Sequence, residues 1–194
     1  MKAVMLVRHG SHAELGRVLS GRSEIALDPR GRAEAEALVD GLEGTPIASL
    51  HASPRRRARE TIAPLAERRG LAVRAAPALD EIDFGAFAGR EFDALQGNAD
   101  WDRWNAERAT ARCPGGETMA EAAARATGYL LALADADFPA LCVTHCDIIR
   151  GIVAEQTGRG FGAMFELDCD PASVTSFAIE GERLRPVSIN RRFR

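Results

Sequence analysis

The sequence predicts a three-layer α/β/α sandwich with a mostly parallel central sheet and a C-terminal β-hairpin. Through most of the chain, short apolar runs of strand length alternate with longer segments of helical pattern. Such alternation is typical of a parallel sheet whose strands are connected by helices. The tail differs, because two short β-like runs flank Glu180-Gly181-Glu182, which indicates a hairpin.

Length and composition indicate a single domain spanning residues 1–194. A chain of 194 residues can bury a substantial core, and 46% hydrophobic and 27% charged residues are ordinary values for a globular protein. The net charge of −3 argues against nucleic acid as a partner, since nucleic-acid-binding domains are usually basic. No linker, internal repeat or low-complexity tract divides the chain.

The second helix has the clearest start signal of the expected elements. Ser53 is a favourable N-cap and Pro54 a favourable first helical residue, which places Arg57 in the first turn. In chain order, we expect parallel strands near 2–8, 47–52, 71–75 and 140–144, helices near 30–43, 54–69, 118–134 and 147–157, and hairpin strands at 174–179 and 184–189.

Residues 84–117 form an irregular segment that is rich in glycine, aspartate and aromatic residues. Long irregular segments in compact domains are often functional, so we expect an inserted cap-like segment lying over a site. Its basic residues are few and do not indicate a second phosphate on a ligand. Its aromatic residues are placed to wall a ligand pocket: Phe84, Phe87, Phe92, Trp101 and Trp104.

The apolar run before Arg8 is too short for a secretory signal, and no stretch is long enough to span a membrane. We therefore expect a cytoplasmic protein that has no membrane partner. Its four cysteines show no Cys-x-x-Cys spacing, which favours reduced thiols; they are Cys113, Cys142, Cys146 and Cys169.

Charged or titratable residues follow several of the expected strands. Arg8 and His9 follow the first strand, Glu81 comes soon after the third, and His145 follows the fourth. In an open α/β sheet, ligands bind beyond the carboxyl ends of the strands. Arg57 can reach the same edge, because long side chains on a helix lean toward its N-terminus. One edge of the sheet therefore collects two arginines, two histidines and a glutamate.

This set of side chains suits phosphoryl transfer. Arginines donate forked hydrogen bonds to phosphate oxygens and neutralise their charge. A neutral imidazole can attack phosphorus and carry the phosphoryl group, while a second histidine stabilises charge in the transition state. A carboxylic acid of raised pKa can protonate the leaving alkoxide. We expect no metal and no cofactor, because the arginines and the second histidine supply the positive field.

Ordered motifs run nearly from one end of the chain to the other. They are Arg8-His9-Gly10, the segments 21–31, 53–61 and 79–85, Pro114-Gly115-Gly116-Glu117-Thr118, and Val143-Thr144-His145 with Arg150. Together they resemble the histidine phosphatase superfamily, in its phosphoglycerate-mutase-like branch. The resemblance implies an α/β fold and metal-independent hydrolysis of a small phosphorylated metabolite through a phosphohistidine.

The resemblance also implies a role for each matched residue. His9 is the expected nucleophile, which becomes phosphorylated, and Glu81 is the expected proton donor. Arg8 and Arg57 are expected to bind the phosphoryl group together with His145, which is also the second catalytic histidine.

Several features leave alternatives open. Ser11-His12 stands where the family often has Glu-Thr, and Cys146 replaces the usual glycine after the second histidine. The chain is also shorter than the mutases it resembles, which favours hydrolysis over phosphoglycerate mutase activity. A non-catalytic phosphate-binding regulatory module is a further alternative, although such a module has no need for Glu81. Asp147 is the alternative proton donor, since some distant relatives use an aspartate near that histidine.

The remaining histidines and arginines of these motifs are expected to have structural or surface positions. His51 is expected to be structural and His12 to lie at the rim of the site. Arg55, Arg56 and Arg59 are expected to form a solvated helix face.

Overall fold

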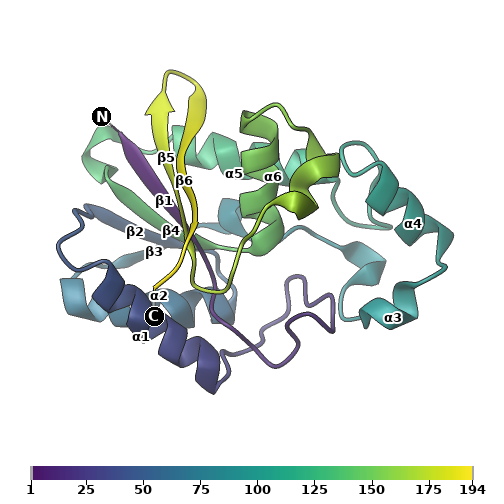
Figure 1. Cartoon of the computed structure of the whole chain (residues 1–194), viewed down its shortest axis with the longest axis horizontal. Coiled ribbons are helices and arrows are strands. Elements are labelled where there is room, and N and C mark those ends of the chain that lie inside the picture. Colours follow the sequence, from purple (N-terminus) through teal and green to yellow (C-terminus); the bar gives the residue numbers. More distant parts are fainter. Residues whose placement is uncertain (1, 194) are drawn as a thin grey trace.

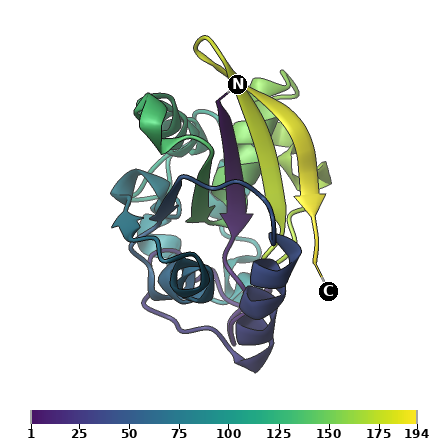
Figure 2. The ribbon, with the colours of Figure 1, turned by 90° about the vertical axis from the view of Figure 1, so that its left-hand side faces the viewer.

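The structure is a computed structural model that describes residues 2–193, and it has a central sheet between two layers of helices (Figures 1 and 2). The sheet order is β3-β2-β4-β1-β5-β6. Strands β1 to β4 are parallel, β5 is antiparallel to β1, and β5 and β6 form the C-terminal hairpin. The expected fold class is confirmed. The strands are β1 Ala3–Arg8, β2 Ser49–Ala52, β3 Val73–Ala75, β4 Ala140–Thr144, β5 Val174–Glu180 and β6 Arg183–Arg191.

Four of the α-helices lie close to the ranges expected from the sequence, and two short ones, at 92–95 and 99–106, lie in the segment 84–117 that was expected to be irregular. They are α1 Pro29–Gly41, α2 Arg56–Arg69, α3 Phe92–Leu95, α4 Ala99–Ala106, α5 Met119–Leu131 and α6 Cys146–Gln156. The expected start of the second helix was wrong by two residues, because the N-cap is Arg55 and not Ser53. The Ser53 hydroxyl instead contacts His145 and Asp80, and Arg57 still lies in the first turn.

The hydrophobic core consists of two clusters, one on each face of the sheet, because the side chains of each strand alternate between the faces. Val4 and Leu6 of β1 face the cluster that contains the buried residues of α5 and α6. Met5 and Val7 face the cluster that contains the buried residues of α1 and α2. Because successive side chains of a strand point to opposite faces, a continuous apolar strand is buried by helices on both sides. This places the four long helices in two pairs that cover opposite faces of the sheet.

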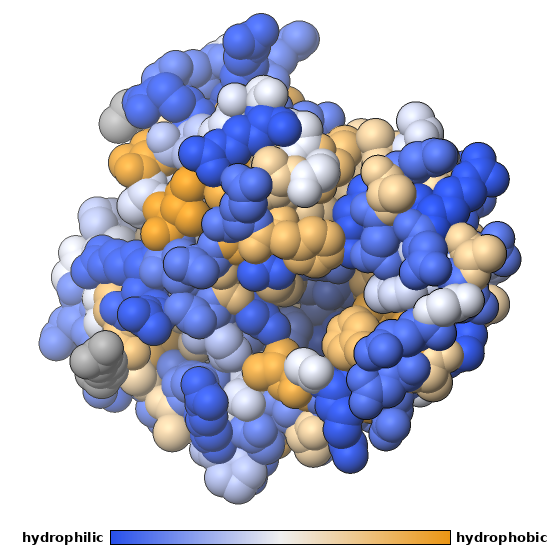
Figure 3. Space-filling view, turned by 45° about the vertical axis from the view of Figure 1, so that its right-hand side comes forward, coloured by the Kyte–Doolittle hydropathy of each residue, from blue (hydrophilic) through white to orange (hydrophobic). Residues whose placement is uncertain are grey.

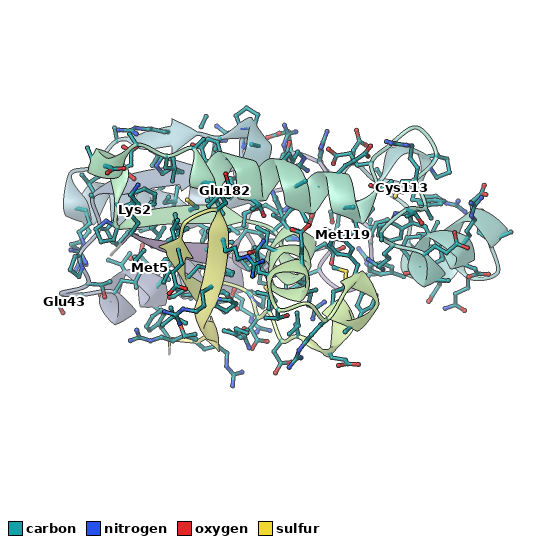
Figure 4. All side chains as sticks on the ribbon, turned by 90° about the horizontal axis from the view of Figure 1, so that it is seen from above. Lys2, Met5, Glu43, Cys113, Met119 and Glu182 are labelled. Atoms are coloured by element: carbon teal, nitrogen blue, oxygen red, sulfur yellow. The ribbon has the colours of Figure 1, made fainter. Side chains whose placement is uncertain are left out.

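The segment that carries α3 and α4 extends beyond the end of the sheet (Figure 1). Seen from above, Cys113 lies beside this segment, and Met119 lies where the chain returns to α5 (Figure 4). The segment is tied to the loop after β1 by an isolated antiparallel bridge between Val18 and Glu91. Within residues 2–193, no helix is both long enough and apolar enough to cross a membrane.

Two glycines allow the loop after β1 to pack on the start of α1. A Cβ added to Gly10 would lie 2.7 Å from the Gly31 carbonyl oxygen, and one added to Gly31 would lie 2.1 Å from the Ser11 carbonyl oxygen. Real Cβ atoms do not approach other atoms so closely, so both positions require glycine. The backbone of Gly10 is therefore in close contact with the backbone of Gly31, a contact that the sequence did not indicate.

Replacing Gly31 with alanine is expected to destabilise the protein, because the new methyl group would overlap backbone atoms of Ser11 that cannot move freely. Overpacking of this kind costs about 1–3 kcal/mol. Gly128→Ala is the matched control, since Gly128 lies in α5 with no atom within 4 Å of the added Cβ. The free energy of unfolding in urea measures both effects. Equal stability of the two variants would contradict the close packing of the two loops.

Candidate active site

A cavity of about 430 Å³ opens beyond the carboxyl ends of β1 and β4, next to the segment that carries α3 and α4. Figure 3 shows a hollow on the face that brings this segment forward, with hydrophobic and hydrophilic side chains around it. The polar and charged residues in its wall are Arg8, His9, His12, Ser20, Arg57, Glu81, Asn105, Arg108, Asp147 and Arg150. The aromatic residues of the wall are Phe84, Phe92, Trp101, Trp104 and Phe165, and its other residues are Leu15, Gly16, Val18, Leu19, Gly21 and Cys146.

His9 is held in one tautomer by its own backbone. The residue is 3% exposed, and its Nδ1 lies 2.9 Å from the Gly10 carbonyl oxygen. A carbonyl oxygen can only accept, so Nδ1 carries the proton and Nε2 keeps its lone pair. Burial and the charges of Arg57 and Arg8 hold the pKa of His9 well below its ordinary value. His9 is therefore a neutral imidazole with a free nitrogen lone pair at the cavity.

Arg8 and Arg57 bring unpaired donors to the same cavity. The guanidinium of Arg57 is almost completely buried and donates to the carbonyl oxygens of Gly21, at 2.6 Å, and Ser23, at 3.1 Å. One Nη of Arg8 donates to the carbonyl oxygen of Cys169. Within the described chain, the Nε groups of both arginines are buried without a hydrogen-bond partner. Both side chains line the cavity, so their positive charges can attract an anion to it.

His145 is fully buried behind Arg57. It belongs to a chain of hydrogen bonds in which each group donates to the next, from Arg57 to Asp80. Arg57 donates to its Nδ1 at 3.0 Å, since a guanidinium can only donate. Its Nε2 therefore carries the proton and donates to Ser53 Oγ at 2.8 Å, and Ser53 in turn donates to Asp80 Oδ1 at 3.2 Å. Burial and the charge of Arg57 lower the pKa of His145 well below its ordinary value. The ring centroid of His145 lies 5.2 Å from that of His9.

Glu81 has the properties of a proton donor. Burial, followed by the negative charge of Asp147, raises its pKa from 4.5 to about 8. Its Oε1 accepts from the backbone N–H of Ile82 at 3.0 Å, and its Oε2 lies 3.9 Å from Nδ1 of His145. At neutral pH the carboxyl group is therefore protonated in the folded protein. A neutral acid at this position can give its proton to a leaving group bound in the cavity.

A network of partly buried ion pairs holds the backbone of Glu81 in place. Arg22 and Arg125 both donate to the Glu81 carbonyl oxygen, at 2.9 Å and 3.0 Å. Both arginines also bind the carboxylate of Glu117, which accepts the backbone N–H of Asp83 as well. Glu117 lies in the Pro114–Thr118 motif, so the structure gives that motif a positioning role for the loop that carries Glu81.

The structure brings together all the site residues expected from the sequence. Arg8, His9, Arg57 and Glu81 line the cavity, and His145 lies behind Arg57. His12 also lies in the cavity wall, and its ring centroid is 5.2 Å from that of His9. Burial lowers the pKa of His12 to about 4.

Most of the other residues lie where the sequence indicated, but Phe87 and Arg55 do not. Phe87 was expected to wall the ligand pocket, but it is buried in the hydrophobic core and does not line the cavity. His51 contacts Ser49 and Tyr129, as expected for a structural histidine. Arg56 and Arg59 are exposed, but Arg55 was wrongly assigned to the solvated face. Its side chain is only 23% exposed and forms an ion pair with Asp80 at 3.1 Å. The cause is the loop after β3, which brings Asp80 over the start of α2.

Three participants in the site were not found from the sequence. Ser53 was interpreted as a helix cap, and Asp80 as a loop carboxylate, although both follow strands that end at the site. Their position after a strand is the signal that could have found them. Phe165 comes from the short 3₁₀ segment Phe161–Glu166, and its sequence neighbourhood gives no such signal. The residues described contain no cluster of three histidine, cysteine, aspartate or glutamate side chains suited to a metal ion.

The chain belongs to the histidine phosphatase superfamily, branch 1, whose family model matches residues 4–192. It is a phosphatase of this superfamily, in which the nucleophile is typically a histidine. The match covers the motifs from Arg8 to Arg150 and includes every residue of the candidate site.

Individual relatives agree with the family match. A phosphoserine phosphatase 1 from Hydrogenobacter thermophilus is 27% identical and covers 94% of this chain and 89% of its own. An uncharacterized protein of Mycobacterium tuberculosis is 34% identical, over 93% of this chain and 92% of its own. The solved structure of a mycobacterial glucosyl-3-phosphoglycerate phosphatase complexed with VO3 is 26% identical, with a TM-score of 0.84 over 98% of this chain and all of the other.

The raised pKa of Glu81 predicts a pH-dependent stability difference. Glu81 is protonated in the folded state up to about pH 8 but ionises near 4.5 when unfolded, so the wild type loses stability as the pH rises through this window. The Glu81→Gln variant keeps a neutral side chain and is expected to gain stability relative to the wild type over the same window. The gain is at most about 1.4 kcal/mol for each pH unit that separates the folded and unfolded pKa values.

Urea unfolding at about pH 5 and about pH 8 measures this difference, with the exposed Glu36→Gln as the control that should show none. A constant difference between the Glu81→Gln variant and the wild type at both pH values would show that Glu81 is ionised in the folded protein.

Proposed function

We propose that this protein hydrolyses small phosphomonoesters, without a metal, through a phosphohistidine formed on His9. The observation that carries the proposal is the hydrogen bond from His9 Nδ1 to the Gly10 carbonyl oxygen. It leaves Nε2 as a free nucleophile inside a buried cavity where two arginine Nε donors have no partner. The substrate phosphate provides the acceptors that these donors lack.

In the first step, Nε2 of His9 attacks phosphorus and the bond from phosphorus to the ester oxygen breaks. Arg8 and Arg57 bind the non-bridging oxygens and neutralise the charge that they carry. Glu81 gives its proton to the leaving oxygen, which departs as an alcohol. The raised pKa of Glu81 supports this role, because the acid must be protonated before the bond breaks.

His145 is proposed to stabilise the transferring phosphoryl group together with Arg57. Without a ligand, burial and the nearby positive charge of Arg57 keep the ring neutral. A phosphate dianion reverses this effect and favours a proton on Nδ1. The Nη of Arg57 that donates to Nδ1 then turns to the phosphate, which frees Nδ1 to donate to the phosphate as well. The other side of the ring is prepared for that charge, since Nε2 donates through Ser53 to Asp80, whose carboxylate lies 3.7 Å from the ring nitrogen.

In the second step, water attacks the phosphohistidine and the bond from phosphorus to His9 breaks. Glu81, now ionised, accepts the proton from the water and returns to its neutral form. The products are the alcohol and inorganic phosphate, and no metal takes part, because the arginines supply the positive charge.

The substrate is proposed to be a small phosphorylated metabolite that fits the cavity of about 430 Å³. The relatives with assigned activities include a phosphoserine phosphatase, a glucosyl-3-phosphoglycerate phosphatase and an α-ribazole phosphatase, which all act on small phosphorylated compounds. We propose that the segment 84–117 caps this cavity and selects the leaving group. The four cysteines are free thiols, which supports the proposed cytoplasmic location.

Replacing His9 with alanine is expected to abolish turnover, because the substitution removes the proposed nucleophile. Wild-type protein incubated with a ³²P-labelled aryl phosphate and excess chelator, then quenched in alkali, should carry acid-labile label that maps to His9. His12→Ala is the matched control, which should retain the label. Label on Ser11 or Cys146, or activity that vanishes with the chelator and returns with added metal, would overturn the mechanism.

Replacing Glu81 with glutamine is expected to slow alkyl phosphates far more than aryl phosphates. An alkoxide leaves poorly without a proton, whereas a nitrophenolate leaves readily. A general acid contributes about 10²–10⁴-fold, and this loss should fall on the alkyl substrate. The ratio of kcat/KM for the two substrates measures the effect. An equal loss on both would transfer the role of acid to another group, with Asp147→Asn the next variant to assay.

A further inference from the structure

Arg108 is a buried cation in the cavity wall that the proposed reaction does not use. The residue is 4% exposed and belongs to the turn between α4 and α5. Its guanidinium carbon lies 4.0 Å from the ring centroid of Trp104 and 4.1 Å from that of Phe165. Two aromatic contacts hold the planar guanidinium in place without neutralising its charge.

The hydrogen bonds of Arg108 leave part of its guanidinium unsatisfied. One Nη donates to Asn105 Oδ1 at 2.6 Å, and the other has only the thioether sulfur of Met164, a weak acceptor, at 3.8 Å. Its Nε is buried and has no partner among residues 2–193, and the same holds for the indole Nε1 of Trp104. Both residues line the cavity, so two adjacent side chains of its wall carry buried donors that lack acceptors.

The charge of Arg108 is also uncompensated. Over the part of the chain that the structure describes, no carboxylate lies within ion-pair distance of it. Burial lowers its pKa, and the charge of Asp147 in the cavity wall is the largest opposing influence. A buried charge without a partner is costly, and a bound anion removes that cost.

We propose that Arg108 binds a carboxylate on the leaving group, so that the preferred substrates are phosphomonoesters of small carboxylic acids. This inference rests on the proposed function, because Arg108 shares a cavity with His9 and Arg57. The guanidinium edge matches the two oxygens of a carboxylate, and Trp104 Nε1 offers a further donor. A carboxylate carries the single negative charge that balances Arg108.

The test compares pairs of substrates that differ only at the carboxylate. O-phosphoserine is paired with O-phosphoethanolamine, and 3-phosphoglycerate with glycerol 3-phosphate. We expect the wild type to favour the carboxylated member of at least one pair in kcat/KM. In Arg108→Met, that preference should fall by about 10- to 100-fold, the effect of losing a hydrogen bond between charged groups.

Arg103→Met is the matched control, because Arg103 is an exposed arginine of α4 that pairs with Glu107 outside the cavity wall. It should keep the wild-type preference. Arg108→Lys retains the charge but not the fork, so its preference should lie between those of the wild type and Arg108→Met. If Arg108→Met does not fold, the ratio of kcat/KM within each substrate pair is compared between Arg108→Lys and the wild type instead.

The inference is overturned if the wild type prefers neither carboxylated substrate, or if substitution of Arg108 lowers both members of a pair by one common factor. A wild-type preference for propane-1,3-diol bisphosphate over the carboxylated substrates would assign a second phosphate to this position instead. If the wild type does not hydrolyse even p-nitrophenyl phosphate, the proposed function itself is wrong. This assay therefore distinguishes failure of the proposed function from failure of the inference about Arg108.

Discussion

The parallel pairing of β1 and β4 is the constraint on which the site depends. Arg8 stands opposite Thr144 in the register, and the backbone N–H of His9 donates to the Thr144 carbonyl oxygen at 3.0 Å. Because parallel strands end at the same edge, the residues that follow each strand, His9 and His145, come to lie with ring centroids 5.2 Å apart. Helix α2 then adds Arg57 from the adjacent layer, and its guanidinium contacts the second histidine.

Burial of so many cations in one place determines how each titratable group behaves. Burial, followed by the charges of Arg57 and Arg8, lowers the pKa of His9, so the proposed nucleophile stays neutral. Burial beside Asp147 raises the pKa of Glu81, so the proposed acid stays protonated. The unliganded site therefore carries an excess of positive charge. A bound phosphate dianion would neutralise that excess positive charge. The arginines proposed to bind the substrate are therefore also the residues proposed to activate it.

The functional groups are rigid because a second layer of polar contacts supports them. Glu117 joins Arg22 and Arg125, and both arginines hold the carbonyl oxygen of Glu81. Asp80 pairs with Arg55 and accepts from Ser53, which fixes the proton on the second histidine. These contacts join loops that are distant in sequence, so a change in the supporting layer is transmitted to the reacting groups without touching the substrate.

The sequence by itself determined the fold class, the order of the elements and the residues at the sheet edge, because apolar runs and strand ends are local signals. His9, Arg57, Glu81 and His145 could be found this way. The tertiary structure alone decided the tautomers of the histidines, the role of Ser53 and the approach of Arg108 and Phe165 to the cavity. These depend on contacts between segments far apart in the chain, and burial, which sets charge and pKa, exists only after those segments have packed together.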